Sequence, residues 1–170
     1  MFRKFLIASG AIAISTSVAS AHITLETGEA KIGTNYKAVL RVPHGCDGKA
    51  TTAVRVQIPE GVIAAKPMPK VGWKLETVKG KYAKSYDLYG TPVSEGVKEI
   101  IWSGGELPDE FYDEFVFRAM LTDSLTAGDA LHFPVVQQCG GTAERWIEVP
   151  AKGQDPEALE LPAPGLKLVN

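Results

Sequence analysis

The sequence predicts an all-β protein built as an antiparallel β-sandwich. Short segments in which apolar and polar residues alternate recur along the chain at a spacing of roughly ten residues. Turn-forming residues separate them, with 17 glycines and 11 prolines in the chain. No long segment has the 3.6-residue period of an amphipathic helix. Together these observations favour two packed sheets of short strands within one domain.

The strands follow from the alternation. Residues 36–44 place Tyr36, Ala38, Leu40 and Val42 on one face, and residues 51–59 alternate in the same way. The glycine-rich segment HGCDGKA between them predicts a hairpin-like connection. Further strands are predicted at residues 73–80, 84–90, 97–104, 114–121, 130–139 and 145–150.

Two segments are not predicted to form strands. Residues 107–114 suit a short helix, because Pro108 and the acidic residues after it favour a first helical turn. Residues 151–170 are rich in proline, so we expect an extended C-terminal tail that lies on the surface or is partly disordered. The sandwich domain is therefore predicted to span residues 22–150.

The first 21 residues have the pattern of a signal peptide. Arg3 and Lys4 form a short positive region, an apolar stretch follows, and Ala19-Ser20-Ala21 is a cleavage triplet of small residues. An uncleaved membrane anchor is the alternative, but the apolar stretch is shorter than the ~20 residues that span a bilayer. We expect cleavage after Ala21, a periplasmic or secreted protein, and no membrane anchor after cleavage.

The charge of the mature chain argues against a nucleic-acid partner. Loss of Arg3 and Lys4 leaves 16 basic and 20 acidic residues, a net charge of −4. The sequence has no run of lysines and arginines that would form a basic patch.

Cys46 and Cys139 are the two cysteines of the chain. An exported protein meets an oxidising environment, which favours a disulfide between them. A thiolate metal site is the alternative, but the two cysteines lack the close spacing of structural zinc motifs.

The sequence contains no motif of a common enzyme class: no nucleophile elbow, no phosphate-binding glycine loop and no His-Glu-x-x-His. A catalytic triad would have to use His22, His44 or His132. His44 lies at a strand end near Cys46, where a turn residue is the ordinary interpretation. His132 lies within a predicted strand, where a surface or hydrogen-bonded core histidine is more common.

His22 differs because cleavage after Ala21 would make it the first residue. A terminal histidine offers its α-amine and its imidazole Nδ1 to one ion, and the amine has an ordinary pKa near 8. Nitrogen donors of this kind favour Cu(II) among the first-row divalent ions. Strand alternation places Glu26 on the same side as His22, and Glu29 follows in a turn, although solvated carboxylates are the usual interpretation of both. A blue-copper centre is disfavoured, because no histidine follows Cys139.

Several blocks of the mature chain resemble one family. They are Ala21-His22-Ile-Thr, RVPHGCDGKATTAVRVQIPEGV (41–62), KPMPKVGWKLE (66–76), IIWSGGELPDEFYDEFVF (100–117), LHFPVVQQC (131–139) and RWIEVP (145–150). In their order and spacing they are similar to the YcnI-like proteins, which are exported bacterial proteins.

This resemblance implies a cupredoxin-like or immunoglobulin-like β-sandwich that binds Cu(II) through one N-terminal histidine. Here that residue is His22. The resemblance also implies that Trp146 lies close to the metal, and it suggests Glu29 as the carboxylate near copper. A separate periplasmic copper chaperone or copper importer is the implied partner.

We therefore expect a copper carrier or chaperone and not an enzyme. An oxidative copper enzyme is the alternative, and it would need His44 or His132 as a second imidazole at His22. A β-sandwich module that binds no metal, such as an adhesion or carbohydrate module, is the third hypothesis.

Overall fold

The structure, a computed structural model, describes residues 22–170. The predicted signal peptide lies outside the described residues. Within them, almost all regular structure is β-strand, as predicted. The strands are β1 (Thr24–Leu25), β2 (Glu29–Lys31), β3 (Asn35–Val42), β4 (Thr51–Gln57), β5 (Val62–Pro67), β6 (Lys74–Leu88), β7 (Thr91–Leu107), β8 (Asp113–Leu121), β9 (Ala130–His132), β10 (Val135–Cys139), β11 (Thr142–Trp146) and β12 (Gly165–Val169).

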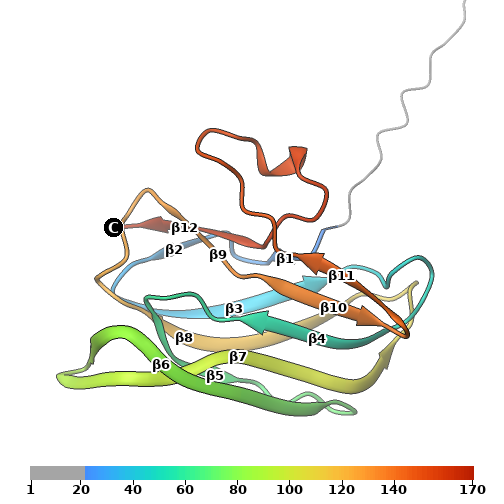
Figure 1. The fold of residues 1–170 in the computed structure, drawn as a ribbon, viewed down its shortest axis with the longest axis horizontal. Helices are drawn as coiled ribbons and strands as arrows, with labels where there is room; N and C mark the ends of the chain where they lie inside the picture. Colours follow the sequence, from blue (N-terminus) through green and yellow to red (C-terminus); the bar gives the residue numbers. More distant parts are fainter. Residues whose placement is uncertain (1–21) are drawn as a thin grey trace, which may run out of the picture.

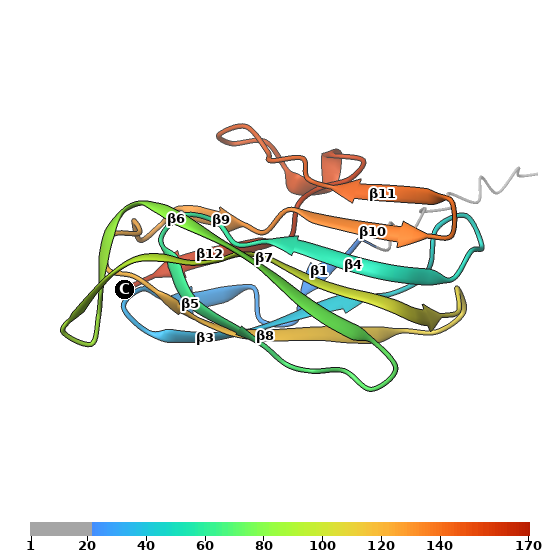
Figure 2. The same cartoon turned by 60° about the horizontal axis from the view of Figure 1, so that its bottom comes forward.

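Two sheets form the sandwich (Figures 1 and 2). One has the order β1-β3-β8-β5, and the other has the order β11-β10-β4-β7-β6. A small third sheet, β2-β12-β9, contains the parallel pair β2–β12, and the other strand pairs are antiparallel. Trp102, Phe115, Phe117 and Phe133 fill the space between the layers, each at most 1% exposed.

The strands predicted at 36–44 and 51–59 are confirmed as β3 and β4. The prediction of a hairpin-like connection between them is wrong. These two strands belong to different sheets. The segment HGCDGKA therefore crosses from one layer to the other instead of turning back beside its own strand. Local alternation identifies a strand but does not say which partner it pairs with.

The longest hairpin joins β6 to β7 and merges the predicted strands 73–80 and 84–90 into one. Its turn is made by Tyr89 and Gly90, both with positive φ (52° and 83°). A two-residue turn of this kind matches the twist of paired strands. The hairpin reaches past the neighbouring strands at one end of the molecule (Figures 1 and 2).

The prediction of a short helix at residues 107–114 is wrong. Leu107 ends β7 and Asp113 begins β8, so the connection between them is too short to stabilise an α-helix. In this connection the Asp109 carboxylate accepts a hydrogen bond from the Gly45 amide at 3.0 Å.

The predicted division at Pro150 also needs correction, because the last residues belong to the fold. Gly165–Val169 form β12, which pairs with β2 and β9. Leu166 and Leu168 alternate with Lys167 and are at most 2% exposed. The burial of these two leucines makes this strand part of the core, whereas the residues between β11 and β12 form a loop with one short 3₁₀ helix (Pro156–Ala158).

Replacement of Leu166 by alanine is therefore expected to lower the free energy of unfolding by about 2–5 kcal/mol, as for other buried leucines. The matched control is Lys167→Ala in the same strand, where only an exposed ion pair with Glu29 is lost and about 1 kcal/mol or less is expected. Urea unfolding measures both. Equal losses for the two variants would mean that β12 does not pack on the core.

Candidate functional site

The site lies where the described chain begins, at His22, just before β1. Ile23 and Leu25 point into the core and are 1% and 5% exposed. The Arg41 side chain holds β1 to β3 by donating hydrogen bonds to Thr24 Oγ1 at 3.2 Å and to the Leu25 carbonyl at 3.3 Å. The core and the sheet therefore fix the position of His22.

The His22 imidazole packs against the Trp146 indole. The two ring centroids are 5.6 Å apart and the rings meet edge to face at 62°. Both residues are buried, with exposed fractions of 8% and 4%. This contact joins the two sheets, because β1 pairs with β3 whereas Trp146 ends β11 in the other layer. It also brings together the two residues that the family resemblance placed at one site.

A buried hydrogen-bond network holds the indole in place. Trp146 Nε1 donates to Gln137 Oε1 at 3.0 Å. Gln137 is 1% exposed, and its Nε2 donates to the His44 carbonyl at 2.7 Å and to Thr51 Oγ1 at 2.8 Å. Each polar atom of the Gln137 amide therefore has a partner, which is the arrangement that rigidifies a buried polar group.

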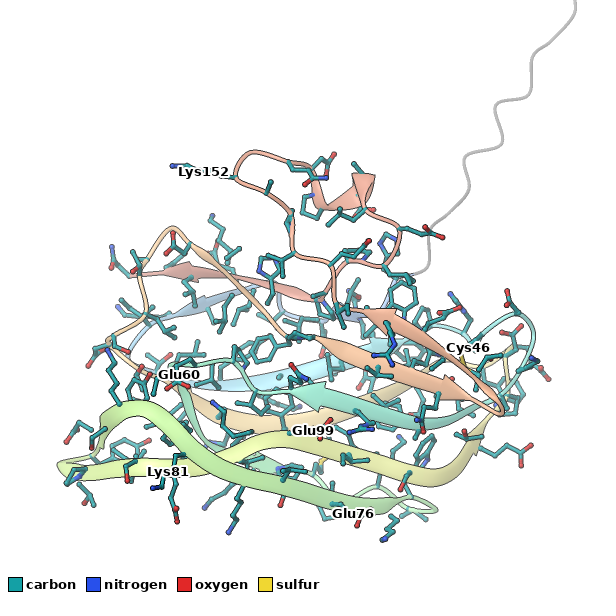
Figure 3. The ribbon with its side chains drawn as sticks, viewed as in Figure 1. Cys46, Glu60, Glu76, Lys81, Glu99 and Lys152 are labelled. Atoms are coloured by element: carbon teal, nitrogen blue, oxygen red, sulfur yellow. A yellow bond between two sulfur atoms is a disulfide. The ribbon has the colours of Figure 1, made fainter. Side chains whose placement is uncertain are left out.

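The loop between β11 and β12, residues 147–164, brings a carboxylate to His22. Glu157 Oε2 lies 3.9 Å from His22 Nδ1, and the Glu157 side chain is 76% exposed. Glu157 lies in the 3₁₀ helix, which starts at Pro156. Asp155 caps that helix by accepting a hydrogen bond from the Glu157 amide at 3.0 Å. Figure 1 shows this loop standing above β1 and β11, and Figure 3 labels Lys152 on it.

Glu148 closes the base of this loop. Its carboxylate accepts a hydrogen bond from the Leu161 amide at 2.8 Å, and its carbonyl accepts one from the Ala163 amide at 2.8 Å. The two ends of the loop are thus joined. The loop and residues 22–25 line a small, partly open cavity of about 130 Å³. The cavity is lined by His22, Ile23, Thr24, Leu25, Pro156, Glu157, Pro162, Ala163, Pro164 and Gly165.

The structure places Glu29, the carboxylate suggested by the resemblance, in another contact. Glu29 lies in β2, opposite Lys167 of β12, and its Oε2 is 2.9 Å from Lys167 Nζ. It does not line the cavity at His22. Sequence reasoning missed Glu157, which is far from His22 in the chain and reaches it only because the loop folds back.

The other two histidines occupy different places. His44 Nδ1 donates to the Gly45 carbonyl in the crossover between β3 and β4. His132 ends β9, and its burial lowers the pKa of the imidazole. Neither residue lines the cavity at His22. Across residues 22–170, no group of three or more His, Cys, Asp and Glu side chains is arranged to hold a metal ion.

The predicted disulfide is confirmed. Cys46 and Cys139 are joined by a bond of 2.05 Å, which closes a separation of 93 residues. It ties the crossover segment to the end of β10, at the end of the sandwich where Figure 3 labels Cys46. Thr51 Oγ1, which contacts Gln137, also lies 3.8 Å from Cys139 Sγ. The disulfide therefore adjoins the network that holds Trp146.

The two-layer architecture defines an immunoglobulin-like β-sandwich. The fold is similar to that of an uncharacterized protein from Nocardia farcinica whose crystal structure reveals an immunoglobulin-like fold. The two share 24% identity and a TM-score of 0.65, and the match covers 89% of this chain and 100% of that one. A cohesin of the Acetivibrio cellulolyticus scaffoldin B, solved with a Cel5 dockerin mutant, is more distant. It has 12% identity and a TM-score of 0.42, and the match covers 86% of this chain and 97% of that one.

The chain belongs to the family described as a domain of unknown function, DUF1775, whose model matches residues 22–168. This is the domain family of the YcnI-like proteins, as the resemblance indicated. The match begins at His22 and ends at Leu168 within β12. No curated protein matches the chain. No helix within residues 22–170 has the length and apolar character needed to cross a membrane.

Proposed function

We propose that the chain, cleaved after Ala21, is an exported protein that binds Cu(II) at His22 and carries or buffers copper. The proposal is carried by one observation: a carboxylate oxygen of Glu157 lies 3.9 Å from Nδ1 of a histidine that cleavage would make terminal. Cleavage would turn the His22 amide nitrogen into an amine, so that the residue could chelate one ion through two nitrogens.

The distance between Nδ1 and the carboxylate suits a shared ion. Nitrogen and oxygen ligands lie about 2.0–2.2 Å from a divalent ion such as zinc, so two ligands of one ion are at most about 4.4 Å apart. The separation of 3.9 Å falls within this limit. We infer that Glu157 supplies the carboxylate for which the family resemblance suggested Glu29, with Trp146 beside the imidazole.

The difference in exposure between the two proposed ligands supports a carrier in preference to an enzyme. The Glu157 side chain is largely exposed, whereas His22 is held firmly by the packing around it. A partner could therefore displace the carboxylate and add its own ligands before the histidine releases the ion. A separate periplasmic chaperone or copper importer is the partner that this exchange requires.

The Glu157→Gln variant of the mature protein is expected to bind Cu(II) about tenfold more weakly, because the amide is a poorer ligand for the ion than the carboxylate. Glu29→Gln is the matched control, with the same chemical change at the other candidate carboxylate, and is expected to bind within about twofold of the unmodified protein. Competition with a chromophoric chelator measures both affinities. A larger loss in Glu29→Gln than in Glu157→Gln would restore Glu29 as the ligand and reject our assignment.

Copper is also expected to quench the fluorescence of Trp146, because this indole lies against the proposed ligand. We expect Trp146→Phe to remove most of the copper-dependent quenching. Trp73→Phe is the control, since Trp73 packs against Phe115 in the core, and it should keep the quenching. Quenching that persists in Trp146→Phe and disappears in Trp73→Phe would place copper elsewhere.

A further inference from the structure

Three basic side chains lie side by side on the outer face of the sheet β1-β3-β8-β5. Arg118 of β8 lies directly opposite Lys37 of β3 on one side and Lys66 of β5 on the other. All three side chains are exposed, whereas their chain neighbours Ala38, Phe117 and Ala119 are buried in the core. We refer to Lys37, Arg118 and Lys66 as the cationic row.

Such a row opposes the stability of the sheet. Residues directly opposite each other have Cβ atoms about 4.5–5.5 Å apart, and like charges at that distance repel. Within the described part of the chain, none of the three forms an ion pair, whereas Arg55, Lys70, Lys74, Lys98 and Lys167 each do. The mature chain is acidic overall, with a net charge of −4, so a general excess of basic residues does not explain the row.

An apolar groove of about 420 Å³ runs beside the row. Its lining combines the three cations with Pro67, Met68, Pro69, Val116 and Phe117. The Met68 amide donates to the Val116 carbonyl at 2.8 Å, which holds the start of the β5–β6 connection against β8. The Met68 side chain is 53% exposed. The surface thus offers positive charge and a nonpolar contact area next to each other.

We propose that the cationic row and its groove bind an acidic segment of a partner protein. Carboxylates of the segment would lie over Lys37, Arg118 and Lys66, and an apolar side chain between them would enter the groove at Met68. The binding would offset the repulsion within the row. The proposal concerns a surface apart from the cavity at His22 and does not depend on copper.

The charges around the row favour a narrow segment over a membrane surface. Asp113 and Glu114 begin the same strand, β8, and Glu114 is on the same face as Arg118 by strand alternation. A flat anionic bilayer would approach these carboxylates together with the row, and the net negative charge of the chain would oppose it. A peptide segment can contact the row without covering them.

The test uses the mature protein without copper and a peptide of sequence Glu-Glu-Leu-Glu-Glu that carries an uncharged fluorophore. Fluorescence anisotropy should show binding at low salt that weakens as salt is raised, because exposed charges are screened. The peptide Gln-Gln-Leu-Gln-Gln should bind at least tenfold more weakly. Lys37→Gln/Lys66→Gln/Arg118→Gln should weaken binding of the acidic peptide at least tenfold.

A scattered variant, Lys49→Gln/Lys81→Gln/Lys152→Gln, is the matched control, because it removes the same charge from exposed positions outside the row. Figure 3 shows Lys81 on the β6–β7 hairpin and Lys152 on the loop above the sandwich. The scattered variant should bind the acidic peptide within about twofold of the unmodified protein. Equal losses in the two triple variants would show that binding follows only net charge and would overturn the proposal.

Two further readouts complete the test. Loss of the repulsion should raise the midpoint of thermal unfolding of the row variant by about 1–3 °C relative to the scattered variant. A lower midpoint would mean that the three side chains stabilise the sheet, which contradicts the premise. Binding to vesicles of phosphatidylglycerol and phosphatidylcholine that requires the row, without binding of the acidic peptide, would replace the protein partner by a membrane.

Discussion

The variant Cys46→Ala/Cys139→Ala is expected to lose about 4–5 kcal/mol of unfolding free energy. The disulfide closes a separation of 93 residues, and in the chain-entropy model a crosslink over a loop of that length restricts the unfolded chain by this amount. Such a loss is a large fraction of the total stability of a domain of this size. Alanine avoids placing a hydroxyl group in the buried positions of the two cysteines.

Chemical unfolding of the oxidised protein, the reduced protein and the double variant measures the effect. Reduction of the unmodified protein is the control, and it should give a loss close to that of the variant. A loss below about 1 kcal/mol in both cases would mean that the disulfide does not stabilise the fold by restricting the unfolded chain. The buried Gln137 network lies beside the disulfide through Thr51, so we also expect the emission of Trp146 to change on reduction.

The second large effect is expected at the proposed copper site. His22→Ala in the mature protein should lower the affinity for Cu(II) about 100-fold or more, because it removes the imidazole while the terminal amine remains. His132→Ala is the control, since His132 lies in β9 and does not line the cavity at His22. The control should bind within about twofold of the unmodified protein.

Competition with a chromophoric chelator measures both variants. Similar affinity in His22→Ala and the unmodified protein would reject His22 as a ligand. A comparable loss in His132→Ala would favour the alternative of a copper enzyme with two imidazoles. Because the packing of Ile23 and Leu25 holds the start of the chain independently of the imidazole, we expect His22→Ala to fold.

The sequence predicted the strands of this fold better than their partners. Alternation in residues 36–44 and 51–59 located β3 and β4, but pairing is a property of residues distant in the chain, and these two strands pair in different sheets. The segment Gly165–Val169 alternates as clearly, with Leu166 and Leu168 on one face. The prolines before it favoured the prediction of an extended tail, so this strand was not predicted.

The candidate site was predictable only in part, because some of its contacts join residues that are distant in the sequence. The cleavage pattern singled out His22, and the family resemblance supplied Trp146, which the structure places against it. Glu157 carried no local signal, because its approach to His22 depends on how residues 147–164 fold back and on the contacts of Glu148 that close their loop. The position of an exposed carboxylate relative to a distant residue is set by tertiary structure and not by its neighbours in the sequence.

Cleavage after Ala21 is expected to create the proposed copper site, because it frees the amine of His22. A form in which His22 has no free amine tests this expectation. A chelator competition would compare the mature protein with a form that carries Gly-Ser-Gly-Ser before His22. Four residues are used because an amine only one or two residues before the imidazole would form a new chelate with it. We expect one tightly bound Cu(II) in the mature protein and an affinity about 100-fold or more lower in the extended form. Equal affinities in the two forms would show that the amine of His22 is not a copper ligand.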